Sequence, residues 1–110
     1  IEYTEEQIQE YLHKGFEHIN HLPVKVLVSH TPPKNMCDRT LFKTHAGSNS
    51  VAQFCCEHNI TLCICGHIHE ACGIGKLGNT TVVNTGSLKR GYYASILVAL
   101  NGVEATIKRL

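Results

Sequence analysis

Residues 61–70 have the sequence Thr-Leu-Cys-Ile-Cys-Gly-His-Ile-His-Glu, a short apolar run that stops at a glycine and is followed by two histidines. An apolar run of this length, bounded by a breaker of regular structure, is typical of a strand that is covered on both faces. Gly66 lets the backbone turn sharply where the strand ends. Open α/β sheets bind ligands just beyond such carboxyl ends, so His67 and His69 are candidate metal ligands.

A second buried strand is predicted at residues 24–29, Val-Lys-Val-Leu-Val-Ser, and it ends directly at His30. Between the two strands, Ser48 is a good cap for a short amphipathic helix that Asn59 would end. Strand, helix and strand in this order form a βαβ unit, whose two strands are parallel neighbours. The pattern therefore brings His30 to the same edge of the sheet as the histidine pair.

The remaining elements are predicted from capping and turn signals. Thr4 and Gln7 form a capping box at the start of a helix that should end before Pro23. Asn101-Gly102 is a strong β-hairpin signal. The expected strands after the βαβ unit are residues 71–74, 80–84, 92–100 and 103–110. A turn is expected at residues 75–78. The sequence thus predicts an α/β protein, a parallel βαβ unit followed by antiparallel strands and a C-terminal hairpin.

Composition excludes several classes of protein. The chain has 110 residues, of which 43% are hydrophobic and 17% charged, as in one small globular domain. Its net charge of +1 gives no support for binding to nucleic acid or to an anionic membrane. No apolar run approaches the ~20 residues of a transmembrane helix, and Ile1 does not begin a signal peptide. A soluble, cytoplasmic protein is expected.

Six cysteines raise the question of a disulfide framework. Such frameworks belong to secreted, loop-rich chains, and the apolar strands do not fit that class. Four of the cysteines are expected to be small buried hydrophobes: Cys55, Cys56, Cys63 and Cys65. Cys37 and Cys72, in or beside loops, are the expected exceptions.

The three strand-end histidines suit a metal site, because neutral imidazole is a common ligand of borderline divalent ions. The alternative is that hydrogen bonds within the fold satisfy them. Three further histidines, on or just after the first helix, are expected to be solvated surface residues: His13, His18 and His21. His45 is a fourth candidate for the site, since it precedes the helix capped by Ser48. Helix amino ends bind anions, so Gly47 and Ser48 are candidates for holding a phosphate, the alternative being that Ser48 only caps the helix.

Four segments together resemble a known family. They are residues 28–33 (Val-Ser-His-Thr-Pro-Pro), 45–48 (His-Ala-Gly-Ser), 65–70 (Cys-Gly-His-Ile-His-Glu) and 84–87 (Asn-Thr-Gly-Ser). In this order and spacing they resemble the carboxyl-terminal half of a calcineurin-like metallophosphoesterase, of the small archaeal and bacterial type. The resemblance covers nearly all of residues 24–100.

The resemblance implies a fold, a reaction and a set of ligands. The fold would be an α/β/β/α sandwich, of which this chain forms half. The activity would be hydrolysis of a phosphomonoester or phosphodiester by a metal-bridging hydroxide, with two divalent ions of Mn, Fe or Zn as cofactors. His30 and His67 would bind the second ion and His69 the first.

The motifs that supply the rest of that centre in the family, Asp-x-His, Gly-Asp-x-x-Asp or Asn, and Gly-Asn-His-Asp or Glu, are absent here. Residues 1–110 are therefore expected to be the C-terminal portion of a single domain whose N-terminal half is absent from this chain. The chain alone would be inactive and carries no catalytic residue of its own. It would pair with the missing half or a partner chain, or form a homo-oligomer. The alternative is a non-catalytic metal-binding or protein-interaction scaffold of the same fold.

Overall fold

The computed structural model describes residues 3–110 and contains two helices that begin at side-chain caps. Helix α1 (Glu5–Phe16) starts with the predicted capping box, in which the Thr4 hydroxyl accepts from the amide of Gln7 at 3.1 Å. The Gln7 side chain accepts from the amide of Thr4 in return. Helix α2 (Asn49–Glu57) is capped by Ser48, whose hydroxyl accepts from the amide of Val51 at 3.1 Å. Neither helix in the described part of the chain has the length and apolarity needed to span a membrane.

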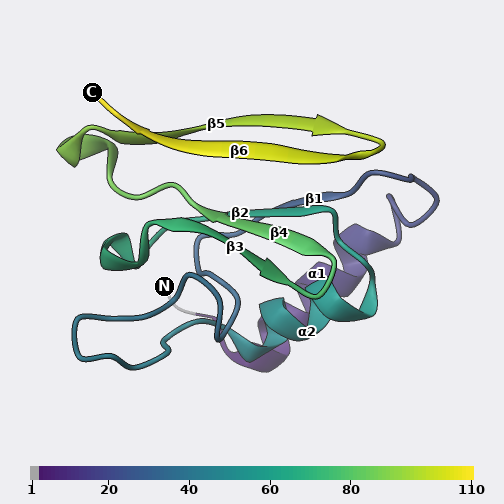
Figure 1. The fold of residues 1–110 in the computed structure, drawn as a ribbon. Coiled ribbons are helices and arrows are strands. Elements are labelled where there is room, and N and C mark those ends of the chain that lie inside the picture. The colour runs from purple at the N-terminus through teal and green to yellow at the C-terminus, as the bar shows by residue number, and fades with distance from the viewer. Residues whose placement is uncertain (1–2) are drawn as a thin grey trace.

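A four-stranded sheet holds the fold together, with the strand order β1-β2-β4-β3. Its strands are β1 (Val26–Val28), β2 (Leu62–Cys65), β3 (Gly73–Leu77) and β4 (Thr80–Asn84). The first three in spatial order run parallel, and β3 is antiparallel to β4. Both helices lie under one face of this sheet (Figure 1). The main core lies between α2 and the sheet, and its buried residues are Val51, Phe54, Cys55, Ile60, Cys63, Cys65 and Val82.

A hairpin forms a second, smaller sheet over the opposite face (Figure 1). It consists of β5 (Tyr92–Ala99) and β6 (Gly102–Arg109), joined at the predicted Asn101-Gly102 turn. Alternate hairpin residues are only half-buried, and among them Val103 and Ala105 line a cleft against β3 and β4. The layers are therefore helix, sheet and sheet, which confirms the predicted fold class as half of an α/β/β/α sandwich.

The β1 end of the sheet has an uncovered apolar face. Leu27 packs against the core on the helix side. Because side chains alternate across a strand, Val26 and Val28 point to the other face, where they are 41% and 75% exposed. β1 is also an edge strand of the sheet. A strand of this apolar character normally has cover on both faces, so part of the expected packing is missing here.

The turn predicted at residues 75–78 is wrong, because residues up to Leu77 belong to a strand. The strand predicted at residues 71–74 lies further along the chain. Residues His69–Ala71 form a 3-10 turn, and β3 continues through Gly75 to Leu77. Gly75 leaves room for the side chain of Met36, whose sulfur would have to move if a Cβ were present at this position. The reversal falls instead at Gly78, which has a left-handed φ of 59°.

The cysteines are all free thiols, so the disulfide alternative is wrong. Cys55, Cys63 and Cys65 are buried as predicted, and Cys37 and Cys72 are partly buried. Cys56 is the wrong prediction in this group, because it lies on the outer face of α2 and is exposed.

Candidate metal centre

His30 and His67 meet at the carboxyl ends of β1 and β2. The ladder between these strands continues beyond them, since the amide of Gly66 donates to the carbonyl of His30 at 3.2 Å. This pairing places the two histidines side by side although they are 37 residues apart. Nε2 of His30 and Nδ1 of His67 form a hydrogen bond with each other at 2.9 Å, so part of the hydrogen-bonding alternative is present, and both side chains are exposed. The convergence predicted from the βαβ pattern is therefore present for this pair.

The turn that presents His67 is held by Asn84. His67 has a φ of 62°, a left-handed conformation that costs free energy for a residue other than glycine. The buried side-chain amide of Asn84, at the end of β4, donates to the carbonyl of Ile68 at 2.9 Å and to that of Cys37 at 3.1 Å. These bonds join the histidine turn to the long loop before α2. Sequence reasoning noted Asn84 only as part of a motif and missed this role.

The geometry of the His30–His67 pair fits a shared metal ion. Imidazole nitrogens bind zinc at roughly 2.0–2.1 Å, so two of them on one tetrahedral ion lie roughly 3.3 Å apart. The observed 2.9 Å between the two nitrogens is shorter than that spacing, so an ion would replace their hydrogen bond and the rings would move slightly apart. A pair of exposed imidazoles already at this separation needs little rearrangement to bind an ion.

His69 occupies a different place. It begins the 3-10 turn His69–Ala71 and is exposed. Within residues 3–110, His30, His67 and His69 do not form a group whose ligand atoms all lie within 4.8 Å of one another. The assignment of His69 to a separate ion stays a prediction.

Asp38 is the centre of the loop between β1 and α2, and sequence reasoning missed this role as well. Its buried carboxylate is 2.7 Å from Nδ1 of His45 and accepts at 2.9 Å from each of the backbone amides of Asn35 and Gly47. Burial opposes ionisation of Asp38, but the hydrogen bonds from His45 and the two amides outweigh it and hold the pKa of the carboxyl below its ordinary value. One signal in the sequence could have indicated this role of Asp38: it is the only aspartate in the chain and lies within a loop rich in turn residues.

Gly47 allows this loop to pack against the His30 segment. A Cβ at Gly47 would lie 2.6 Å from the carbonyl oxygen of Pro33 and 2.7 Å from that of Pro32. The amide of Ser48 donates to Pro32 at 2.9 Å in the same contact. The His-Thr-Pro-Pro and His-Ala-Gly-Ser segments are therefore fixed to each other by backbone contacts.

The amino end of α2 already holds a carboxylate. Glu5 accepts from the Ser48 hydroxyl at 2.9 and 3.0 Å and from the amide of Ser50 at 3.1 Å. The amide of Gly47 is bound to Asp38. Of the predicted phosphate-binding residues His45, Gly47 and Ser48, the side chain of His45 thus has the most freedom to meet a ligand. The side chain of His45 is 42% exposed. Asp38 fixes its ring through Nδ1, so Nε2 is the ring nitrogen that is available to a ligand.

An open cavity of about 580 Å³ joins these elements. Its lining includes Ser29, His30, Thr31, Gly47, Ser48 and His67. The thiol of Cys37 does not line this cavity, and burial and the neighbouring Cys65 raise its pKa to about 11. Among the residues that line the cavity, His30 and His67 are the ones with imidazole donors.

The fold and the histidine pair agree with a family match over nearly the whole chain. Residues 2–109 match the model of the family described as metallophosphoesterase, calcineurin superfamily, and the chain belongs to this family. An uncharacterized protein of Methanocaldococcus jannaschii is 44% identical over an alignment of 88 residues, which covers 76% of this chain and 39% of that protein.

Two solved crystal structures share the fold. One is 28% identical, with a TM-score of 0.71 over 92% of this chain and 39% of the other. The second is TT1561 of Thermus thermophilus, which is 25% identical with a TM-score of 0.63 over 94% of this chain and 42% of the other. The chain thus spans about two fifths of the length of the proteins it matches.

Proposed function

We propose that this chain supplies the histidine ligands of a dinuclear centre in a metal-dependent phosphoesterase. His30 and His67 would share one ion and His69 would bind the other. The observation that carries the proposal is the 2.9 Å separation of the His30 and His67 nitrogens at adjacent parallel strand ends. Two divalent ions, of Mn, Fe or Zn, would stabilise the attacking and leaving oxygens of an in-line displacement at phosphorus.

The residues of this chain would have distinct tasks around that centre. Asn84 would keep His67 directed at the edge of the sheet through its bond to Ile68. Asp38 would fix the ring of His45, so that Nε2 meets an oxygen of the phosphate. Gly47 and Ser48 would form the wall beside it. The substrate would be a phosphorylated small molecule or a phosphodiester.

The carboxylates of such a centre would come from outside the described residues. Asp38, the single aspartate of the chain, is buried and already makes three hydrogen bonds. Glu70, beside His69, accepts from the amide of Leu41 at 3.2 Å. We propose that residues 1–110 are the C-terminal portion of a single catalytic domain and are inactive alone. The remaining ligands would lie in the missing N-terminal half or on a partner chain. The free cysteines suit a cytoplasmic location.

Metal removal tests the proposed function in the complete domain. Dialysis against a chelator should abolish hydrolysis of p-nitrophenyl phosphate or bis(p-nitrophenyl) phosphate, and added manganese should restore it. The two substrates also decide between monoester and diester hydrolysis. Stoichiometric manganese binding without turnover of either ester would contradict the enzyme proposal and favour a metal-binding scaffold.

The uncovered face of β1 leads to a separate expectation for the isolated 110 residues. Val26 and Val28 expose apolar surface next to an unpaired strand edge, a combination that favours association. The isolated chain should sediment as a dimer or larger species and bind a hydrophobic dye. Val28→Lys should reduce both effects, whereas Thr106→Lys, on an exposed position of β6, should leave them unchanged. A sharply monomeric species without dye binding would contradict the expectation.

A further inference from the structure

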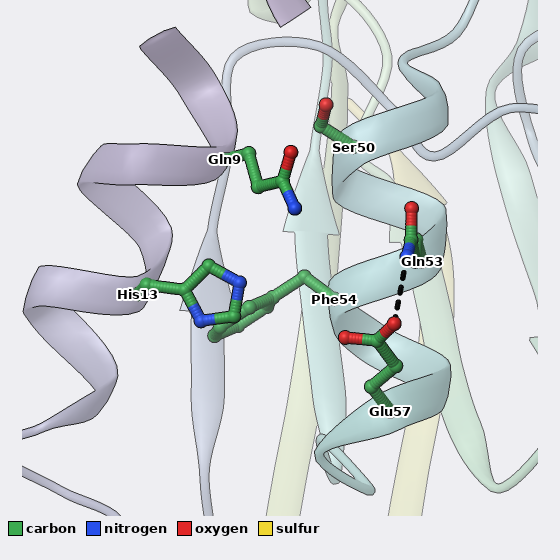
Figure 2. A pocket seen from close by; sticks show the side chains of 6 residues that line it. All are labelled: Gln9, His13, Ser50, Gln53, Phe54 and Glu57. Atoms are coloured by element: carbon green, nitrogen blue, oxygen red, sulfur yellow. Dashed lines mark hydrogen bonds between the residues drawn. The ribbon is translucent and has the colours of Figure 1, made fainter. Parts of the chain in front are cut away.

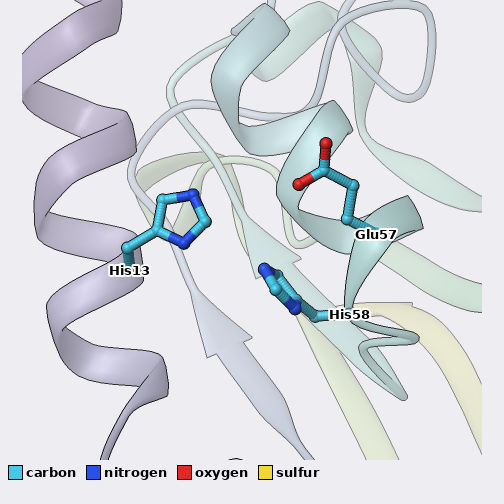
Figure 3. A group of neighbouring side chains, drawn as sticks. All are labelled: His13, Glu57 and His58. Atoms are coloured by element: carbon cyan, nitrogen blue, oxygen red, sulfur yellow. The ribbon is translucent and has the colours of Figure 1, made fainter.

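A second group of metal-binding side chains lies between the carboxyl ends of the two helices. His13 is in the last turn of α1, Glu57 is the last residue of α2, and His58 caps α2. One ligand atom from each residue lies within 4.8 Å of the other two. Figure 3 shows the two rings and the carboxylate directed into the space between the helices. None of these residues belongs to the His30–His67 centre.

His58 is held rigidly, and one of its nitrogens has no partner. Its ring is stacked 4.1 Å from the ring of Phe16 and 4.9 Å from that of Phe54, measured between centroids. Nε2 of His58 is buried and makes no hydrogen bond within the described residues. Buried polar atoms normally have a partner, so the unpartnered Nε2 indicates a bound water molecule or ion.

The other two ligands are oriented toward the same space. The side-chain amide of Gln53 donates to Oε1 of Glu57 at 2.7 Å, which leaves the second carboxylate oxygen available (Figure 2). Ligating carboxylates are commonly fixed by such a neighbour. His13 faces Phe54 and Glu57 from α1 (Figure 2), and these two ligands, His13 and Glu57, line a cavity of about 10 Å³ that His58 does not line. The cavity has room for a single water molecule beside the cluster.

The local charge also favours a cation. The two helices run parallel here, so both place their negative carboxyl ends beside the cluster (Figure 2). Glu57 adds a full negative charge. Lys14, the neighbour of His13 in sequence, is bound to Glu10 at 3.1 Å on the exposed surface of α1.

We propose that His13, Glu57 and His58 bind one zinc ion that clamps α1 to α2. Two imidazoles and one carboxylate form a ligand set that zinc accepts, with water in the fourth position. Ligand atoms around a tetrahedral zinc lie roughly 3.3 Å apart, and His13 and Glu57 are exposed side chains that can close to this spacing. The site lies at the far end of α2 from Ser48 and is separate from the His30–His67 centre.

Zinc titration of the complete protein with paired variants tests the proposal. His13→Gln with Glu57→Gln removes two ligands and keeps His58 with its contacts to Phe16 and Phe54. The matched control is His18→Gln with Glu6→Gln, which changes the same residue types at exposed positions. Chelator-treated protein is loaded with zinc, desalted and analysed for metal content, and its melting temperature is recorded with and without zinc.

The control should keep the wild-type zinc content and the wild-type rise in melting temperature. The His13/Glu57 variant should bind one zinc fewer per chain and show a smaller rise, because an ion that binds only the folded state stabilises it. Equal zinc content and an equal rise in both variants would overturn the proposal.

Discussion

In the proposed metal centre, His67→Ala should lower kcat of the complete domain for phosphoester hydrolysis by about 10³-fold, with the fall in kcat larger than any change in KM. The loss corresponds to about 4 kcal/mol of transition-state stabilisation, in the range that metal-ion catalysis supplies. His67 is placed to share an ion with His30, 2.9 Å away, so its loss leaves that ion with one fewer nitrogen ligand. Manganese affinity should fall together with kcat.

The matched control for this prediction is His18→Ala, which removes an exposed imidazole just after α1. It should retain wild-type kcat and manganese binding. His30→Ala should resemble His67→Ala, and the double variant should be scarcely worse than either single variant, because residues that bind one ion act as a unit. Turnover close to wild type in His67→Ala would contradict the ligand role of this residue.

Asp38→Ala should lower the free energy of unfolding by about 3 kcal/mol. The substitution leaves the backbone amides of Asn35 and Gly47 without their acceptor and removes the partner of His45. Urea unfolding of the complete domain measures the loss. Amide hydrogen exchange should be faster at Asn35 and Gly47, which locates the effect in the loop beside the cavity.

The pH dependence of stability gives a second measurement on Asp38. Because the folded state depresses its pKa, the contribution of Asp38 is present above the ordinary carboxyl value of about 3.9. It is lost as the pH falls through the lower folded value. Wild-type stability should therefore decline more steeply in acid than that of Asp38→Ala. Asp38→Asn, which keeps an acceptor oxygen, should lose less stability than alanine at neutral pH, and Glu104→Ala, on the exposed side of β6, should change little. Parallel acid profiles for wild type and Asp38→Ala would contradict the depressed pKa.

Local patterns predicted the parts of the fold that depend on local chemistry. The capping box at Thr4, the Ser48 cap and the Asn101-Gly102 turn are each contained within a few residues, and all are present. The meeting of His30 and His67 followed from one rule of topology, that strands of a βαβ unit are parallel neighbours.

What the sequence did not predict depends on contacts between distant segments. Asn84 bonds to Cys37, 47 residues away, and no local pattern carries that pairing. Gly75 was predicted to lie in a turn because glycine is common in turns. Its contact with the side chain of Met36, which comes from a distant loop, could not be read from the local sequence. His13 is exposed, as predicted, and what no local pattern indicated is that the packing of α1 beside α2 brings its ring centroid to 5.5 Å from that of His58.

The bond from Glu5 to the start of α2 has a consequence for how the molecule opens. Helix α1 has no fully buried residue, and its first turn is tied to Ser48 and Ser50 through the Glu5 carboxylate. Its carboxyl half is held by packing, in which Leu12 and Phe16 lie against the core and the ring of Phe16 contacts those of Phe54 and His58. Without an ion, local opening of α1 would begin at its carboxyl end, because its first turn is hydrogen-bonded to α2. With the proposed zinc bound at the carboxyl end, both ends of α1 would be fixed to α2.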